Sequence, residues 1–131
     1  MQRDQAIEFC DRWLPAWTGN RPDELIQFYG DGAYFRDPVN PGGLRGRAAL
    51  LSYLQKLLKR NPDWKWARQE VFPTEDGFAL KWRATFPFPS DVVEIDGLDI
   101  VVIENGKIAR NEVYFDTAPL AKFVERGRRD E

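Results

Sequence analysis

Histidine is absent from this chain, and cysteine is almost absent. The 131 residues contain no histidine and one cysteine, Cys10. The chain therefore has no Ser-His or Cys-His triad and no histidine ligand for zinc, iron or haem, and we expect neither a metal nor a cofactor. A single cysteine excludes a disulfide within the chain and is typical of the reducing cytosol, so we expect a cytoplasmic protein.

The chain also lacks an excess of charge and a long apolar run. Nineteen basic residues against twenty-one acidic ones give a net charge of −2. This balance gives no electrostatic reason to expect nucleic acid or an anionic membrane as a partner. No apolar run approaches the roughly 18 residues of a membrane span, and the first residues, Met1 to Asp4, show no apolar signal core.

What is present is the composition of one globular domain, which we take to span residues 1–131. Apolar residues make up 43% and aromatic residues 14% of the chain. Apolar residues at spacings of three and four predict helices over residues 4–18, 22–30 and 46–60, with Pro15 bending or shortening the first of them. A further helix is expected after residue 117, carrying Leu120, Phe123 and Val124.

The second half of the chain is dominated by predicted strands, over residues 64–73, 78–86, 93–104 and 107–115. A short strand at 33–37 follows the turn at 30–32 and precedes a turn-rich loop, while the sequence 87–89 (Pro-Phe-Pro) is expected to end pairing. This order predicts an α+β fold in which a curved antiparallel sheet wraps around helices as a cone. The open mouth of such a cone can hold a small ligand.

Two acids interrupt apolar segments and form a candidate acid/base pair. Asp37 ends the strand at 33–37 and is followed at once by Pro38. Asp99 shares a strand face with Ile95 and Val101, so burial should raise the pKa of its carboxyl group. A shielded carboxylate can move a carbon-bound proton, and a neutral carboxyl group can donate a hydrogen bond to an oxyanion. The alternatives are a turn-capping role for Asp37 and a buried Asp99 satisfied by Trp or Tyr donors.

Aromatic side chains are numerous enough to line a pocket for an apolar molecule. The same aromatic side chains are also needed to pack a hydrophobic core of this size. The candidate substrate-binding residues are Trp13, Trp17, Phe28, Tyr34, Trp66, Trp82 and Tyr114.

The run Phe-Tyr-Gly-Asp-Gly-Ala-Tyr-Phe-Arg-Asp-Pro at 28–38 and the late Asn-Gly-Lys-Ile hairpin at 105–108 resemble the nuclear transport factor 2-like superfamily. Within it, the chain is similar to the SnoaL-like and ketosteroid isomerase-like branch over nearly its whole length. The resemblance implies a homodimer, a proton-shuttling base at Asp37 and an oxyanion-binding acid at Asp99. The family's second oxyanion donor is a tyrosine, and Trp13 stands at that position.

These patterns support two alternative functions. One is cofactor-free proton transfer, an isomerase or lyase step, on an apolar carbonyl compound. The other is a non-catalytic ligand-binding or dimeric interaction domain of the same fold, which the missing tyrosine favours. The epoxide hydrolase-like branch is disfavoured because its Arg-x-Asp unit corresponds here to Arg83-Ala84-Thr85.

Overall fold

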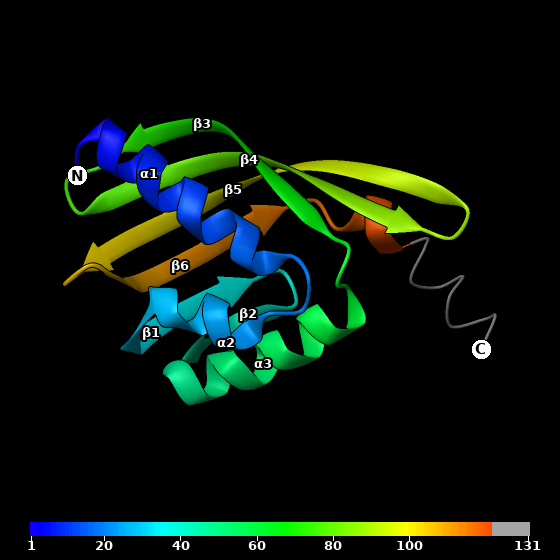
Figure 1. Ribbon diagram of the computed structural model, residues 1–131, viewed down its shortest axis with the longest axis horizontal. Helices are drawn as coiled ribbons and strands as arrows, with labels where there is room; N and C mark the ends of the chain where they lie inside the picture. The colour runs from blue at the N-terminus through cyan, green and yellow to red at the C-terminus, as the bar shows by residue number, and fades with distance from the viewer. Residues whose placement is uncertain (122–131) are drawn as a thin grey trace.

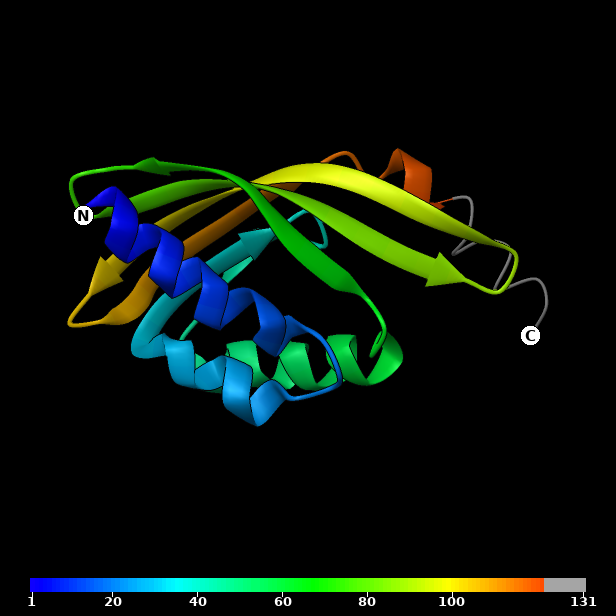
Figure 2. The ribbon, with the colours of Figure 1, turned by 45° about the horizontal axis from the view of Figure 1, so that its top comes forward.

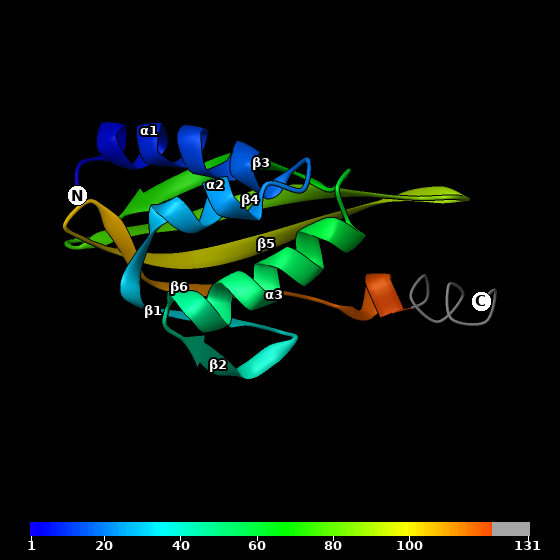
Figure 3. The same cartoon turned by 60° about the horizontal axis from the view of Figure 1, so that its bottom comes forward.

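A computed structural model describes residues 1–121 and contains one six-stranded sheet with helices α1, α2 and α3 gathered on one face (Figure 1). Figures 2 and 3 show the sheet arching over these helices, with its two edges apart, so the cone is open rather than a closed barrel. The predicted α+β class with a curved sheet around helices is confirmed.

The helices begin close to their predicted positions and end at identifiable residues. The first stops early, because Pro15 lies in the next turn and the chain continues as a 3-10 helix. The second is also short and tightens into a 3-10 turn before the first strand. The helical elements are α1 (Arg3–Trp13), η1 (Leu14–Trp17), α2 (Pro22–Leu25), η2 (Ile26–Phe28) and α3 (Arg47–Arg60). Residues 118–121 begin a further helix, and its expected continuation with Phe123 and Val124 lies outside the described residues.

The strands follow the order β2-β1-β6-β5-β4-β3, and all neighbours are antiparallel except β1 and β6, which are parallel. Their bounds are β1 (Tyr29–Asp37), β2 (Asn40–Arg45), β3 (Lys65–Pro73), β4 (Gly77–Phe88), β5 (Asp91–Glu104) and β6 (Lys107–Phe115).

Three sequence-based expectations about the strands are wrong. Residues 30–32, predicted as a turn, belong to β1, and part of the predicted loop after Asp37 forms β2. The chain also stays paired through Pro87, which lies opposite Val92. In β2 and at Pro87, pairing with a neighbouring strand outweighs the local preference of Gly or Pro for a turn, and residues 30–32 form an irregular stretch of β1 between the pairs that Tyr29 and Tyr34 make with β6.

The core lies between the concave face of the sheet and the helices. Trp13 on α1 and Phe78 and Leu80 on β4 are fully buried there, as is Leu54 on α3. α1 lies along β3, and α3 lies against β1 and β2, so the end of β1 is held between α3 and β6 (Figure 3). None of the helices within residues 1–121 combines the length and apolar character needed to cross a bilayer.

Candidate functional site

Asp37 closes the turn between β1 and β2. Its side chain is only 9% exposed. Oδ1 accepts hydrogen bonds from the backbone N–H of Val39 (3.1 Å), from that of Asn40 (2.8 Å), and from the Asn40 side-chain amide (2.9 Å). This is the arrangement by which an Asp stabilises a turn that follows it. The turn-capping interpretation is therefore correct for one of its two oxygens.

The second oxygen of Asp37 faces α3. Oδ2 accepts a hydrogen bond from the Tyr53 hydroxyl at 2.6 Å. Burial, and then the hydrogen bond and the charge of Asp37, raise the pKa of the Tyr53 phenol well above its usual range. Tyr53 therefore stays a neutral donor, and Oδ2, with one described partner, keeps acceptor capacity for a ligand.

A cavity of about 430 Å³ opens beside Asp37, where the ends of β1 and β6 lie next to each other. Its volume lies within the range of roughly 300–1,000 Å³ that is typical of small-molecule sites. Its walls are mainly proline, aromatic and aliphatic. The lining residues are Arg36, Asp37, Pro38 and Pro41 from the hairpin of β1 and β2, and Val113, Tyr114 and Phe115 from β6.

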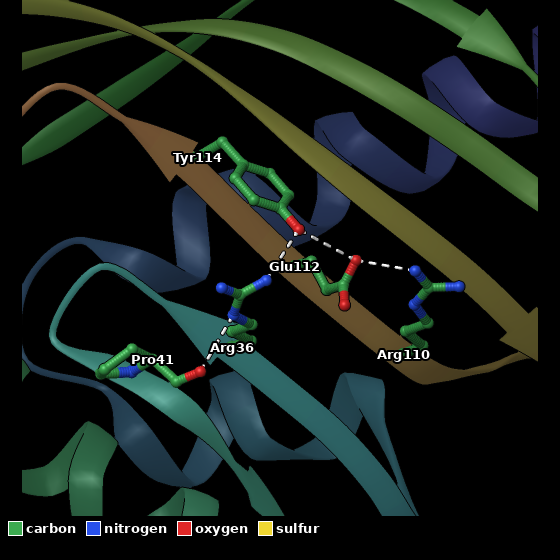
Figure 4. A network of polar contacts seen from close by, with 5 residues as sticks. All are labelled: Arg36, Pro41, Arg110, Glu112 and Tyr114. Carbon is green, nitrogen blue, oxygen red and sulfur yellow. Dashed lines mark hydrogen bonds and ion pairs between the residues drawn. The ribbon is translucent and has the colours of Figure 1, made fainter.

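A polar network borders this cavity on the convex face of the sheet (Figure 4). Arg36 donates from Nε to the Pro41 carbonyl (3.1 Å) and from Nη1 to the Tyr114 hydroxyl (3.3 Å). Tyr114 in turn donates to Glu112 Oε2 (3.3 Å), and Arg110 forms an ion pair with the same oxygen at 2.7 Å. The hydrogen bond from Arg110 holds the pKa of Glu112 below its usual range.

Asp99 lies deeper in the fold, 5% exposed, on the concave face of β5. The Trp82 indole donates to Oδ1 (2.7 Å), and the Asn111 amide donates to Oδ2 (3.1 Å). The Tyr29 hydroxyl donates to the side-chain oxygen of Asn111 at 2.9 Å, and the Asn111 amide nitrogen donates to Asp99, so the chain of hydrogen bonds ends at the Asp99 carboxyl group. Burial raises the pKa of Asp99 to about 7 and outweighs both donors, which act in the opposite direction.

Gly97 makes the contact between Trp82 and Asp99 sterically accessible. It lies opposite Trp82 in the pairing of β4 and β5, and a Cβ atom on Gly97 would overlap the indole ring. The indole can therefore lie flat against the backbone of β5, with its N–H directed at the next inward-facing side chain.

The two acids are neighbours in electrostatic terms but do not share a cavity. The charge of Asp37 is one of the causes that raise the pKa of Asp99. Asp99 does not line the cavity beside Asp37; Val113, which is opposite Asp99 in the pairing of β5 and β6, forms that part of the wall. The structure thus brings Asp37 to a surface cavity and leaves Asp99 behind the wall.

Most of the predicted aromatic lining fills the cone instead. Trp17 contacts Trp13 (6.2 Å between ring centroids) and Trp66 (5.6 Å), and Trp82 contacts Phe115 (5.8 Å). Trp13, Trp17, Trp66 and Trp82 line neither the cavity beside Asp37 nor a second, smaller cavity at Phe28. The indole N–H of the buried Trp13 lies beside the Tyr29 phenol but has no hydrogen-bond acceptor within residues 1–121.

The three remaining predicted residues are dispersed. Tyr114 lines the cavity beside Asp37. Phe28 lines a second, smaller cavity of about 230 Å³ together with Arg12 and Lys107. Tyr34 lies on the convex face, under the Arg45 guanidinium at 5.1 Å from the ring centroid.

Sequence analysis missed Arg36, Tyr53 and Asn111 as site residues. Two of them carried a signal: Tyr53 places a hydroxyl three residues after Leu50 in the apolar stripe of α3, and Asn111 is an amide on the same face of β6 as Val113. Cys10 is fully buried, and burial raises the pKa of its thiol to about 12. Among residues 1–121 no group of three or more His, Cys, Asp or Glu side chains is arranged to hold a metal ion.

Comparison with known proteins gives a consistent result. The family model described as SnoaL-like domain matches residues 10–111. No curated protein matches the chain at a significant level. A SnoaL-like protein of unknown function from Burkholderia thailandensis is similar in structure, with a TM-score of 0.74 and 18% identity over 88% of this chain and 98% of the other.

Two further solved structures were obtained with small molecules. A protein with a ketosteroid isomerase-like fold from Catenulispora acidiphila, in complex with trimethylamine, has a TM-score of 0.77 and 13% identity over 89% of this chain and 92% of the other. TerC, co-crystallised with polyporic acid, has a TM-score of 0.76 and 15% identity over 92% of this chain and 98% of the other. At these identities the similarity shows the shared fold.

Proposed function

The chain belongs to the SnoaL-like domain family, and from that premise we propose that it binds a small apolar carbonyl compound in the cavity beside Asp37 and transfers a proton on it without a cofactor. One observation carries the proposal. Asp37 is nine-tenths buried, lines a cavity with largely apolar walls, and has one carboxyl oxygen bonded to a single described partner. The overall reaction would be an isomerisation or an elimination.

Asp37 acts as the base in this proposal. A carbonyl compound held against Pro38 and Phe115 would present an α-carbon proton to Oδ2, while the turn fixes Oδ1. A carboxylate positioned in this way needs little reorganisation to accept the proton and return it at another carbon. Asp37 carries the proton between the two transfers, and Tyr53 would stabilise its carboxylate form before the first transfer and after the second.

Asp99 is the second candidate catalytic residue. With a pKa of about 7 it can hold a proton near neutral pH, as an oxyanion donor must. To reach a ligand it has to exchange Trp82 or Asn111 for the ligand oxygen, and Val113 has to move aside. Trp13 is too far inside the core of the resting structure to act as a second donor without a similar rearrangement.

The alternative is a non-catalytic ligand-binding domain. It is supported by the four hydrogen bonds that Asp37 accepts, three within its turn and one from Tyr53, and by Trp13 at the position where the resembling isomerases carry a tyrosine. The trimethylamine and polyporic acid structures are consistent with either function, since both of those proteins were crystallised with small molecules.

Deuterium exchange separates these functions. The protein would be incubated in D₂O with cyclic enones, cyclic diketones and aromatic polyketide-like ketones. Binding would be followed by calorimetry and deuterium uptake at carbon by mass spectrometry. We expect uptake by the wild type, and a loss of about 100-fold or more in Asp37→Asn, which keeps the turn acceptor but lacks the base. The matched control is Asp96→Asn, an exposed acid paired with Arg83.

Binding without deuterium uptake would favour the non-catalytic alternative, and absence of binding would contradict both functions. We also propose a cytoplasmic homodimer that associates through the convex face of the sheet. That face carries the exposed side chains of Leu98 and Tyr114, 38% and 41% accessible in the isolated chain.

A further inference from the structure

The network in Figure 4 has one cation more than it has anions. It contains two guanidinium groups, Arg36 and Arg110, and one carboxylate, Glu112. Glu112 is paired with Arg110 at 2.7 Å and is 8% exposed. Arg36 takes part in no ion pair within residues 1–121, although it lines the cavity beside Asp37.

Asp37 does not neutralise Arg36 by direct contact. Successive side chains of a strand point to opposite faces, so Arg36 is on the convex side and Asp37 on the concave side of β1. The hydrogen bonds that Asp37 accepts come from Val39, Asn40 and Tyr53. The Arg36 charge therefore remains available to a ligand at the rim of the cavity.

Arg36 is also held in place before any ligand arrives. Nε is fixed by the Pro41 carbonyl, and the guanidinium carbon lies 5.8 Å from the centroid of the Tyr114 ring. Nη1 makes one long bond, to the Tyr114 hydroxyl, and Nη2 has no described acceptor within residues 1–121. A planar guanidinium with free N–H groups is suited to a carboxylate, which it can bind through two parallel hydrogen bonds.

We infer that this cavity takes a compact cyclic molecule carrying one carboxylate, which binds Arg36 while the ring packs against Tyr114, Phe115 and Pro38. This inference rests on the proposed function, because it names the ligand class of the same site. A single unpaired guanidinium matches one negative charge. A doubly charged phosphate would lie close to Glu112 and Asp37 with no second free cation in the network.

A pair of probes of the same shape tests the inference. Naphthalene-2-carboxylate and its neutral amide, naphthalene-2-carboxamide, would be titrated by calorimetry, and the site located from the NMR shifts of Tyr114 and Phe115. We expect the wild type to bind the carboxylate at least about tenfold more tightly than the amide, since a charge-assisted hydrogen bond is worth about that factor. The preference should weaken as the salt concentration rises.

Three variants complete the test. Arg36→Gln should lose the preference for the carboxylate and keep its affinity for the amide, and Arg36→Lys should retain part of the preference through charge alone. Arg83→Gln, which removes a convex-face guanidinium paired with Asp96, should behave as the wild type. Equal binding of both probes, or a preference that survives Arg36→Gln, would overturn the inference and leave the proposed function standing. Failure of the wild type to bind either probe would overturn the inference, and the deuterium-exchange panel would then decide the proposed function separately.

Discussion

At Asp99, burial and hydrogen bonding act on one carboxyl group in opposite directions. Trp82 and Asn111 both donate to it, which favours the charged form. Burial disfavours that form and is the larger effect, so the pKa rises from 3.8 to about 7. Trp82, which donates a hydrogen bond to Asp99, is also part of the hydrophobic core, so the protonation state of Asp99 is linked to the stability of the fold.

We predict a characteristic pH dependence of stability from Asp99. Below pH 4 the folded and unfolded states both hold the proton. Between about pH 4 and 7 only the folded state holds it, so unfolding releases a proton and a rising pH favours the unfolded chain. Relative to Asp99→Asn, the wild type should lose at most about 4 kcal/mol of unfolding free energy over this range, at about 1.4 kcal/mol for each pH unit between the two pKa values.

Urea denaturation of both proteins from pH 4 to 8 measures this difference. Asp96→Asn is the control: Arg83 lowers the pKa of Asp96, so the difference in stability between this variant and the wild type should be constant from pH 4 to 8 and change only below pH 4. A difference in unfolding free energy between the wild type and Asp99→Asn that does not vary with pH would contradict the raised pKa of Asp99.

Gly97 offers a second test at the scale of one residue. In Gly97→Ala the added methyl group overlaps the Trp82 ring, which has to leave Asp99. Overpacking of this kind costs about 1–3 kcal/mol, and the displaced indole should show an altered fluorescence spectrum. Gly32→Ala, at a position where a Cβ meets nothing within 4 Å, should stay within about 0.5 kcal/mol of the wild type. Equal stability of the two variants would show that Trp82 is not confined by Gly97.

The hairpin of β1 and β2 is the element on which the cavity depends. β2 pairs with β1 through Leu44 opposite Phe35 and Arg45 opposite Tyr34, and it carries Pro41, the acceptor that orients Arg36. The turn before it is organised by Asp37 rather than by an apolar pattern. One side chain thus closes the hairpin and also faces the cavity.

Asp37→Ala should therefore loosen this hairpin. It removes the acceptor of four hydrogen bonds, for which we expect a loss of about 1–3 kcal/mol, and Asp37→Asn should lose less because its amide oxygen can still accept at the turn. Amide hydrogen exchange should become faster at Leu44 and Arg45 and remain unchanged at Leu54 in α3. Unchanged protection of β2 in Asp37→Ala would show that strand pairing alone holds the hairpin.

The same hairpin shows where sequence-based prediction reached its limit. Long periodic segments were predicted well, including α3, β6 and the position where Pro15 ends α1. β2 was missed because its Asn-Pro-Gly-Gly sequence has the composition of a loop, and its strand conformation comes from pairing with β1. Burial of Asp99 follows from alternation along β5, whereas its separation from Asp37 by Val113 depends on how β5 and β6 pair, which no local pattern contains.

At the scale of the molecule, the interior of the cone is filled and the candidate site lies at its rim. Tryptophan rings from α1, η1, β3 and β4 occupy the concave side, and the larger of the two cavities lies at the ends of β1 and β6. Helices α1, α2 and α3 all lie on the other side of the sheet in Figures 2 and 3, and the convex face carries both the network of Figure 4 and exposed apolar side chains. Ligand binding and self-association would therefore both involve Tyr114, which lines the cavity and is exposed on the convex face.

We predict that the wild type sediments as a dimer at micromolar concentration. Leu98→Lys places a charge in the middle of the convex face and should shift the protein to monomer, because burying an unpaired ammonium group is costly. Val39→Lys, at an exposed turn position outside that face, should leave the dimer intact. Sedimentation of the wild type as a monomer would remove the proposal of a dimer.

The location of a bound ligand tests the central claim most directly. A crystal structure of the wild type with a cyclic ketone selected from the deuterium-exchange panel should place the ring in the cavity lined by Pro38 and Phe115. The exchanging carbon should lie roughly 3–3.5 Å from Asp37 Oδ2. A ligand seated instead in the smaller cavity at Phe28, or oriented with its exchanging carbon away from Asp37, would contradict the account.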